Sequence, residues 1–318
     1  MPLIEIQDLI KIYKDYETKI EVPALRGIEL SVAEGELIGI VGPSGAGKTT
    51  LLSIVGGLLS PSSGEVIIND MSISNLDEKQ LTSFRQKTIG FIWQLPEDNL
   101  IANLSLIKNV MLPMQISNKP FESQKKNAKE LLERVGLGSR VDHKPHQVSG
   151  GEAQRAALAV ALANDPLLLL GDQITGELDS ATSEIVIDYL RELNGEFGIT
   201  MMIATHKKQF IQSTDHSFEI KDGRITKVLT STGESWVQTS EANEGQGRTL
   251  PGPKEEFIFV DWQGNLRLPE EVLRAVKLEG LVRAEVEEGI IKLIPVQRKN
   301  STLHLSQKKS SQRRKNNN

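Results

Sequence analysis

Short apolar runs alternate with amphipathic segments over residues 1–230. Residues 37–41 (LIGIV) lead into a glycine-rich turn, so they predict a buried strand, and residues 48–59 predict the helix that follows the turn. Residues 167–170 and 201–204 are further apolar runs of strand length, and polar residues follow each of them. This repeated order of strand, loop and helix is typical of α/β folds with a parallel sheet.

Two other segments carry apolar residues at helical spacing. Apolar residues recur at i, i+3, i+4 and i+7 over 128–135, which predicts an amphipathic helix that ends near Gly136. Residues 186–193 carry a second stripe of this kind. The carboxyl ends of parallel strands share one edge of a sheet, where open α/β sheets bind ligands. The polar residues that follow the predicted strands are therefore candidates for a site.

The glycine-rich turn, GPSGAGKT at residues 42–49, fits the P-loop pattern. Its glycines allow a tight backbone path that turns amide N–H groups toward phosphate oxygens. Lys48 is expected to reach the β- and γ-phosphates of ATP, and the hydroxyl of Thr49 is expected to bind Mg²⁺. Asp172, after the apolar run at 167–170, is the candidate carboxylate on the metal side. The residues expected to bind nucleotide here are Gly42, Ser44, Gly45, Ala46, Gly47, Lys48, Thr49 and Thr50.

The segment VSGGEAQR, residues 148–155, opens an apolar helix that is expected to run to about residue 163. Ser149, Gly150 and Gly151 make a polar helix start with little side-chain bulk, whose N–H groups and dipole can receive an anion. Taken alone, the same residues also fit an ordinary serine-capped helix. The decision between the two interpretations depends on the other motifs.

With the P-loop and Asp172 in the same order and spacing, the chain resembles the ABC ATPase family over roughly residues 1–230. The family signature is LSGGQxxR or LSGGExxR, against VSGGEAQR here. The resemblance implies a P-loop NTPase of the α/β class, with an antiparallel β subdomain and a helical subdomain. It also implies ATP and Mg²⁺ as cofactors and a homodimer in which Ser149, Gly150, Gly151 and Glu152 act on the ATP held by the other copy.

The resemblance assigns further roles one by one. Gln94 matches the glutamine that senses the metal and γ-phosphate and begins the loop that faces a membrane partner, and Asp179 matches the loop that crosses the dimer interface. His206 matches the switch histidine, and Tyr13 the aromatic residue that stacks on adenine, with Tyr16 as the alternative. The implied catalytic residues are Lys48, Gln94, Gln173 and His206, and the implied metal ligands are Thr49, Gln94 and Asp172.

The segment GDQITGELDS departs from the family pattern at two positions. Gln173 stands where the family has the glutamate that accepts a proton from the attacking water, and an amide is not a base, so slow turnover is expected. Ile174 stands where the family usually has proline. Gln173 is either the native residue of a subunit that works mainly by binding ATP or an engineered substitution of glutamate. The intact remaining motifs favour the engineered trap.

The style of the N-terminal sequence and of the stretch after Gln94 resembles the subfamily that serves lipoprotein release, macrolide and peptide efflux, and cell-division signalling. That resemblance implies an integral-membrane permease-type partner, a peripheral position on the inner face of the cell membrane, and no direct contact with cargo. The chain has no cysteine and no run of roughly 18 uninterrupted apolar residues, which fits a cytoplasmic location and argues against a disulfide framework.

The C-terminal part differs in composition. Residues 231–256 are expected to be a flexible linker and residues 297–318 a disordered tail, which holds seven Lys or Arg and no acid. Residues 257–296 predict a small β-rich module with a hairpin about Glu288 and Gly289, and they resemble the AbrB/SpoVT regulators. The module either dimerises or folds onto the ATPase domain.

The acidic balance of residues 256–296, eight acids against five Lys and Arg, makes nucleic acid an unlikely partner of the module. A soluble ABC ATPase that acts on nucleic acid or ribosomes is the alternative function, suggested by the module and the basic tail. A regulatory ATP-binding protein that rarely hydrolyses is a third possibility, favoured if Gln173 is native.

Overall fold

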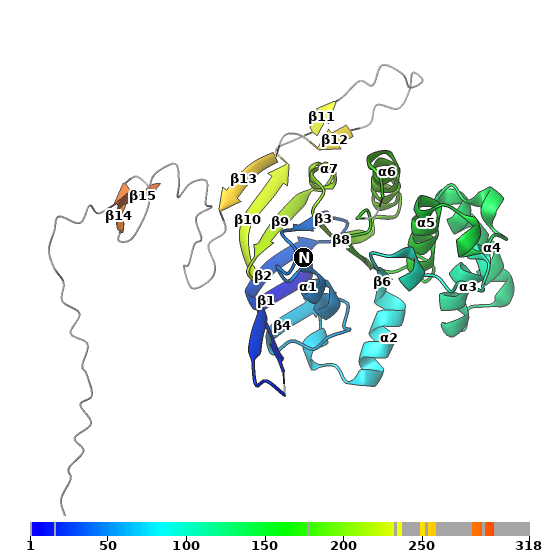
Figure 1. Cartoon of the computed structure of the whole chain (residues 1–318), viewed down its shortest axis with the longest axis horizontal. Coiled ribbons are helices and arrows are strands. Elements are labelled where there is room, and N and C mark those ends of the chain that lie inside the picture. The colour runs from blue at the N-terminus through cyan, green and yellow to red at the C-terminus, as the bar shows by residue number, and fades with distance from the viewer. Residues whose placement is uncertain are drawn as a thin grey trace, which may run out of the picture. The chain divides into compact units, whose positions relative to one another are not determined.

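The computed structural model describes residues 2–15, 17–176, 178–231, 234–236, 249–251, 254–258, 282–287 and 290–295. The chain divides into two units, Met1–Arg267 and Leu268–Asn318, and Figure 1 labels described helices and strands in the first and described strands in the second. Every residue expected to bind nucleotide or metal belongs to the first unit.

A seven-stranded sheet forms the centre of the first unit. Its spatial order is β13 (Lys254–Ile258), β10 (Arg224–Ser231), β9 (His216–Lys221), β3 (Leu37–Val41), β8 (Thr200–Thr205), β7 (Leu168–Asp172) and β6 (Ile89–Ile92). The five strands from β9 to β6 are parallel, whereas β10 and β13 pair in the antiparallel sense. The strands predicted over 37–41, 167–170 and 201–204 are confirmed as β3, β7 and β8.

An antiparallel sheet of four strands forms a second layer of this unit. Its order is β2 (Glu21–Ala33), β1 (Pro2–Lys14), β4 (Ser63–Ile68) and β5 (Met71–Ser72). β1 pairs with β2 over almost its whole length, and the tip of this hairpin exposes apolar side chains, Ile20 and Val22 among them. The antiparallel β subdomain that the resemblance implied is therefore present.

Seven α-helices complete the described part of the first unit. They are α1 (Lys48–Val55), α2 (Glu78–Thr88), α3 (Leu106–Ile116), α4 (Phe121–Arg134), α5 (Gly150–Ala161), α6 (Ser180–Phe197) and α7 (Lys208–Gln212). The predicted helix over 48–59 ends earlier, at Val55, because Gly57 takes a left-handed backbone with φ of 65°. In the part of the chain that the structure describes, no helix is both long enough and apolar enough to cross a bilayer.

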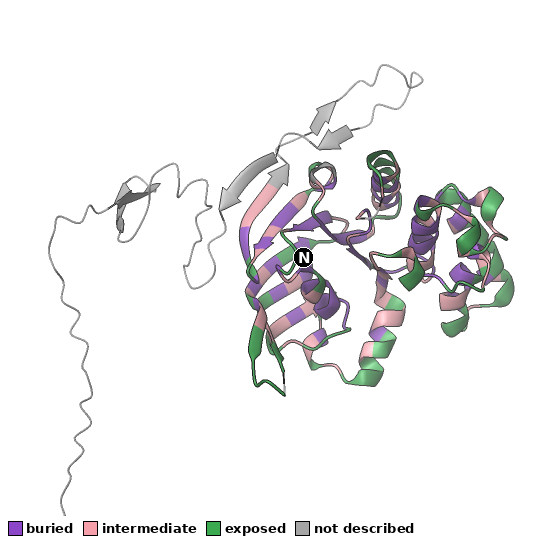
Figure 2. Ribbon diagram, viewed as in Figure 1, coloured by how far each residue is buried: buried purple, intermediate pink, exposed green. Residues whose placement is uncertain are grey.

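Two hydrophobic cores lie on opposite faces of the parallel strands (Figure 2). Side chains alternate between the faces of a strand, and β7 shows the division: Leu168 and Leu170 enter the core beneath α1 and the antiparallel sheet, whereas Leu169 enters the core shared with α3 to α6. The predicted stripe over 128–135 lies on α4, whose residues Ala128 and Leu132 are fully buried in the second of these cores.

Residues beyond 231 are described only in part. β11 (Glu234–Trp236) pairs with β12 (Thr249–Pro251), and β13 joins the edge of the main sheet, so the range 231–256 expected as a linker contains strands. In the second unit, β14 (Val282–Glu287) and β15 (Ile290–Pro295) pair in the antiparallel sense, which confirms the predicted hairpin. Residues 259–281 and the tail 297–318 lie outside the described residues, and the described ones do not support the resemblance to AbrB/SpoVT regulators.

Candidate functional site

The strand order gathers four sequence motifs at one edge of the parallel sheet. β8 lies between β3 and β7, with Thr205 opposite Val41 and Asp172 opposite Ala204, and Ile92 of β6 lies opposite Gly171. The segments that follow these strands therefore leave from the same edge. They carry the P-loop after β3, Gln94 after β6, Asp172 and Gln173 at the end of β7, and His206, which is exposed, after β8.

The glycines of the P-loop are required by close backbone contacts. Gly42 has φ of 150°, and a Cβ there would lie 2.1 Å from the carbonyl oxygen of Ile220. Gly47 has φ of 107°, and a Cβ there would lie 2.6 Å from the carbonyl oxygen of Ala24. Side chains at either position would displace backbone atoms, so the loop can form only with glycine. The loop ends at the first turn of α1, where helix N–H groups attract anions.

Lys48 is buried within the P-loop. Its Nζ donates hydrogen bonds of 2.8 Å to the carbonyl oxygens of Gly42 and Pro43. Burial lowers the pKa of Lys48 from its ordinary value, and the nearby carboxylate of Asp172 opposes that shift. The ammonium is thus held at the loop by carbonyl oxygens of the loop itself. Charged phosphate oxygens would be stronger acceptors than these carbonyls.

Thr49 and Asp172 form the group that fits a metal ion. Thr49 Oγ1 donates a 2.7 Å hydrogen bond to Asp172 Oδ2. Asp172 is only 6% exposed, and its other oxygen, Oδ1, is buried without a hydrogen-bond partner. A hydroxyl and an unsatisfied carboxylate oxygen beside a phosphate-binding loop are the oxygen donors that Mg²⁺ prefers. Among the described residues, no group of three or more His, Cys, Asp or Glu side chains is arranged to hold a metal ion.

Gln94 and Gln173 both lie close to Gly176. A Cβ built on Gly176 would lie 3.5 Å from Nε2 of Gln94 and 3.7 Å from Cβ of Gln173. Gln173 has a left-handed backbone, with φ of 48°, held by hydrogen bonds from its N–H to Ala204 O (2.9 Å) and from Gly176 N–H to its carbonyl (2.7 Å). Ile174 is 2% exposed and belongs to the hydrophobic core that α5 shares, so this side chain anchors the turn by packing.

Tyr13 lies beside the first turn of α1. Its hydroxyl is 3.4 Å from Oγ1 of Thr50, the residue is 43% exposed, and Nζ of Lys11 lies 5.5 Å from the ring centroid. An exposed aromatic face next to a phosphate-binding helix can stack on a nucleotide base. The alternative, Tyr16, lies outside the described residues.

Ser149 begins α5 with a capping box. Its Oγ accepts a hydrogen bond from Glu152 N–H (3.2 Å), and Glu152 Oε2 accepts one from Ser149 N–H (2.8 Å). This bond from the Ser149 backbone is the main cause of the lowered pKa of the Glu152 carboxyl. A Cβ on Gly150 would meet no atom within 4 Å, whereas one on Gly151 would lie 2.3 Å from Cγ2 of Thr182.

Asp179 is the N-cap residue of α6. Its carboxylate accepts hydrogen bonds from the N–H (2.9 Å) and Oγ1 (2.7 Å) of Thr182, and the backbone bond is the main cause of its lowered pKa. Thr182 thus contacts both Asp179 and Gly151, and joins the starts of α6 and α5. Sequence reasoning missed Thr182, although the Asp-x-x-Thr spacing is a capping pattern that could have indicated it.

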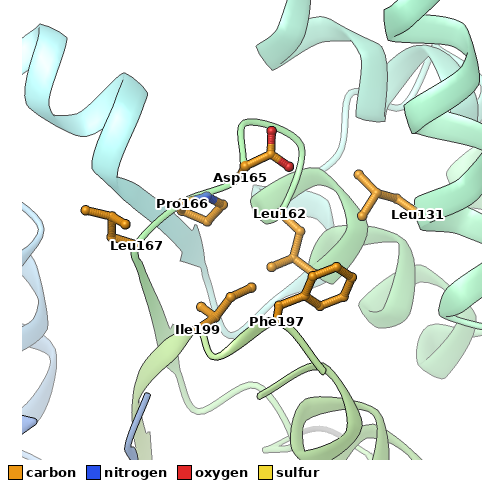
Figure 3. A pocket seen from close by; sticks show the side chains of 7 residues that line it. All are labelled: Leu131, Leu162, Asp165, Pro166, Leu167, Phe197 and Ile199. Carbon is orange, nitrogen blue, oxygen red and sulfur yellow. The ribbon is translucent and has the colours of Figure 1, made fainter. Parts of the chain in front are cut away.

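A separate cavity of about 220 Å³ lies away from these residues (Figure 3). Leu167 precedes β7 and Ile199 precedes β8, so the cavity opens at the amino ends of the strands, opposite the P-loop edge. It contains none of the predicted site residues. Its lining residues are Leu131, Leu162, Asp165, Pro166, Leu167, Phe197 and Ile199.

Comparison with known proteins agrees with this geometry. Residues 25–176 match the family model described as ABC transporter. The chain is 44% identical over 226 residues to an uncharacterised ABC transporter ATP-binding protein of Thermotoga maritima, covering 71% of this chain and 94% of the relative. It is 42% identical over 223 residues to the lipoprotein-releasing system ATP-binding protein LolD of Syntrophus aciditrophicus, covering 70% and 98%.

A solved structure shows the same fold. It is the dimeric post-hydrolysis state of an ATP-binding cassette bound to ADP and Pi, with a TM-score of 0.67 and 37% identity over 72% of this chain and 99% of that one. With the P-loop, Asp172 and the Ser149 helix start in place, the chain belongs to the ABC transporter family, as an ATP-binding subunit.

Proposed function

We propose that this chain binds Mg-ATP between two copies of itself and that the closing and opening of this dimer drives an integral-membrane partner. The observation that carries the proposal is the pair formed by Thr49 and Asp172. The buried Oδ1 of Asp172 has no hydrogen-bond partner, and it lies at the strand edge from which the P-loop leaves. A buried carboxylate oxygen is costly unless a cation or donor satisfies it.

The P-loop half of the site supplies the phosphate contacts. Lys48 Nζ can exchange the carbonyls of Gly42 and Pro43 for phosphate oxygens, and Tyr13 offers its exposed ring to adenine. Mg²⁺, held by Thr49, Asp172 and Gln94, would neutralise charge on the β- and γ-phosphates. His206 follows β8 and is exposed, and we propose that it donates a hydrogen bond to the γ-phosphate.

The second half of the site comes from the other copy. Ser149 and Gly150 are exposed at the start of α5, and the space around Gly150 is open, so this helix start is accessible to an anion on another molecule. The related cassette with ADP and Pi is a dimer. Asp179, at the start of α6, lies next to this surface through Thr182 and would face the partner copy as well.

Hydrolysis by this dimer is proposed to be slow. The amide of Gln173 can hold an attacking water by hydrogen bonds, but it cannot accept the proton of that water. Loss of the negative charge at this position also removes repulsion from the γ-phosphate, which favours the closed, ATP-bound dimer.

Two exposed apolar side chains mark the surface where a membrane partner would dock. Leu95 and Ile101 are 37% and 47% exposed, and they flank the segment that follows Gln94. A partner helix that docks there would move when Gln94 moves, and Gln94 would move when nucleotide binds. The chain would accordingly lie on the cytoplasmic face of the membrane, without touching the cargo.

Sedimentation of the purified chain tests the dimer. We expect a monomer without nucleotide and a dimer with Mg-ATP, and no dimer for Ser149→Arg, which blocks the α5 start without touching the P-loop. The same variant should bind ATP as tightly as the unchanged chain. A chain that binds Mg-ATP but sediments as a monomer contradicts the proposal. Purification with detergent tests the partner: a multi-span protein supports the proposal, whereas ribosomes or DNA contradict it.

A further inference from the structure

Lys207 directly follows His206 and reaches across to another element. Its Nζ donates hydrogen bonds to the carbonyl oxygen of Leu178 (2.8 Å) and to Oγ of Ser183 (2.7 Å), while its backbone N–H donates to Oγ1 of Thr205 (3.1 Å). These contacts, called here the Lys207 bridge, join the end of β8 to the start of α6. The residue is half-buried, and both of these acceptors of its ammonium are protein atoms.

The acceptors of the Lys207 bridge hold the neighbouring interface loop. Leu178 immediately precedes Asp179, and Ser183 is fully buried, with its own Oγ donating to the Leu178 carbonyl (3.3 Å). Ser183 N–H donates to the Asp179 carbonyl (2.9 Å), which completes the first turn of α6. A shift of Lys207 therefore moves a packed, hydrogen-bonded turn rather than a free loop.

The same turn contacts the start of α5. Thr182 is bonded to Asp179 through two hydrogen bonds, and a Cβ on Gly151 would lie 2.3 Å from its Cγ2. Because well-packed interiors transmit displacements, a shift of Thr182 should displace Gly151. Contacts thus run without a break from His206, through Lys207 and α6, to the helix start that carries Gly151.

We infer that Lys207 is a positioning residue that fixes the α6 start, and with it the Ser149–Gly151 helix start, relative to His206. This inference rests on the proposed function, in which His206 contacts one ATP and the Ser149 end of α5 contacts the other. Through the Lys207 bridge, one subunit would couple the ATP at its own His206 to the ATP at the Ser149 end of its α5. Lys207 touches no reacting atom itself.

The substitution Lys207→Met tests the bridge, because it removes the ammonium and preserves the side-chain length. In nucleotide-free protein we expect Lys207→Met to raise amide hydrogen exchange at Thr182 and Ser183 at least about tenfold, because it removes both charge-assisted hydrogen bonds of the ammonium. With Mg-ATP it should weaken dimerisation about tenfold, and ATP affinity of the monomer should change less than about twofold. Lys207→Arg keeps charged donors and should recover most of both losses.

Two further variants make the result specific. Lys129→Met removes an exposed lysine on α4 and should change neither readout. Ser183→Ala removes one acceptor of the bridge, so combining it with Lys207→Met should cost less than the sum of the two changes. Unchanged exchange at Thr182 and Ser183 in Lys207→Met, or equal changes in Lys129→Met, overturns the inference.

The proposed function can fail separately from the bridge. If the unchanged chain stays monomeric with Mg-ATP, the proposed dimer is wrong. Amide hydrogen exchange in the ATP-bound monomer then tests the role of the Lys207 bridge. ATP should alter exchange at Thr182 and Ser183 in the unchanged chain and in Lys129→Met but not in Lys207→Met. No ATP effect, or an equal effect in all three proteins, refutes it.

Discussion

Thr49 and Asp172, which are 123 residues apart in the chain, are joined by a 2.7 Å hydrogen bond from Oγ1 to Oδ2. The bond aligns the hydroxyl at the start of α1 with a carboxylate at the end of β7, two elements that only the folded sheet brings together. It leaves Oδ1 of Asp172 without a hydrogen-bond partner, although the residue is buried. This pair is the basis of the proposed metal site.

Asp172→Asn should abolish the dependence of ATP binding on magnesium. The amide keeps the shape of the side chain but loses the charge and a good metal ligand. For the unchanged chain we expect ATP affinity to fall at least about tenfold when Mg²⁺ is removed with a chelator, and for the variant we expect no change. Calorimetric titration with and without Mg²⁺ measures both. Thr49→Ser keeps the hydroxyl, so it serves as the control and should retain the dependence on Mg²⁺. If ATP binding by Asp172→Asn still depends on Mg²⁺, the metal assignment is wrong.

Gln173→Glu should raise the rate of ATP hydrolysis about 10³-fold, because it supplies a general base at a position next to Gln94. Phosphate release at saturating Mg-ATP gives the rate constant. Adding Lys48→Ala to the Gln173→Glu variant should return the rate to the background level, which assigns the new activity to this site. Equal rates for the unchanged chain and Gln173→Glu would exclude a catalytic role for this position.

Gly150→Ala and Gly151→Ala should have different effects. A methyl group on Gly151 would meet Cγ2 of Thr182 at 2.3 Å, so this variant should lower the free energy of unfolding by about 1–3 kcal/mol. A methyl group on Gly150 meets open space, and its variant should unfold like the unchanged chain yet dimerise poorly with Mg-ATP. Urea unfolding and sedimentation separate the two outcomes. If Gly150→Ala dimerises normally, Gly150 does not face the partner copy.

The pH dependence of stability should include a contribution from Glu152. The Ser149 N–H lowers the pKa of this carboxyl below its ordinary value of 4.5, so the charged form stabilises the fold. The stabilisation is complete above pH 4.5 and is lost as the pH falls through the lowered pKa. Glu152→Gln keeps an acceptor that does not titrate, so its deficit in unfolding free energy relative to the unchanged chain should shrink as the pH falls from about 6 to about 3. A deficit that stays constant over this range would show that Glu152 does not titrate as described.

The parallel sheet and the P-loop could be predicted because their signals are local. Residues 37–41 carry an apolar strand and residues 42–49 carry a contiguous glycine pattern that can be recognised from the sequence, and the structure places both as expected. Asp172 could be proposed as a metal ligand from its place after a strand. Its unsatisfied oxygen could not, because burial and hydrogen-bond satisfaction depend on the whole fold.

Thr182 and Lys207 show what sequence analysis misses. Lys207 belongs to no motif, and the capping pattern of Thr182 does not reveal its distant neighbour. Each residue contacts another about 30 positions away, Gly151 for Thr182 and Leu178 for Lys207. Such contacts follow from how α5, α6 and the end of β8 pack together. The strands within 231–256 were also missed, since the polar sequence there resembles a linker and β13 forms by pairing its backbone with β10.

Neighbouring residues of β7 belong to different cores, Leu169 to one and Leu170 to the other, and the same strand ends at Asp172. Loss of volume on either face is therefore expected to shift the end of this strand, where the proposed metal ligand Asp172 lies. This constrains how the helical region can adapt to a new docking partner. Substitutions in the core beneath α3 to α6 should also weaken nucleotide binding, unless packing on the opposite face of β7 keeps Asp172 in place.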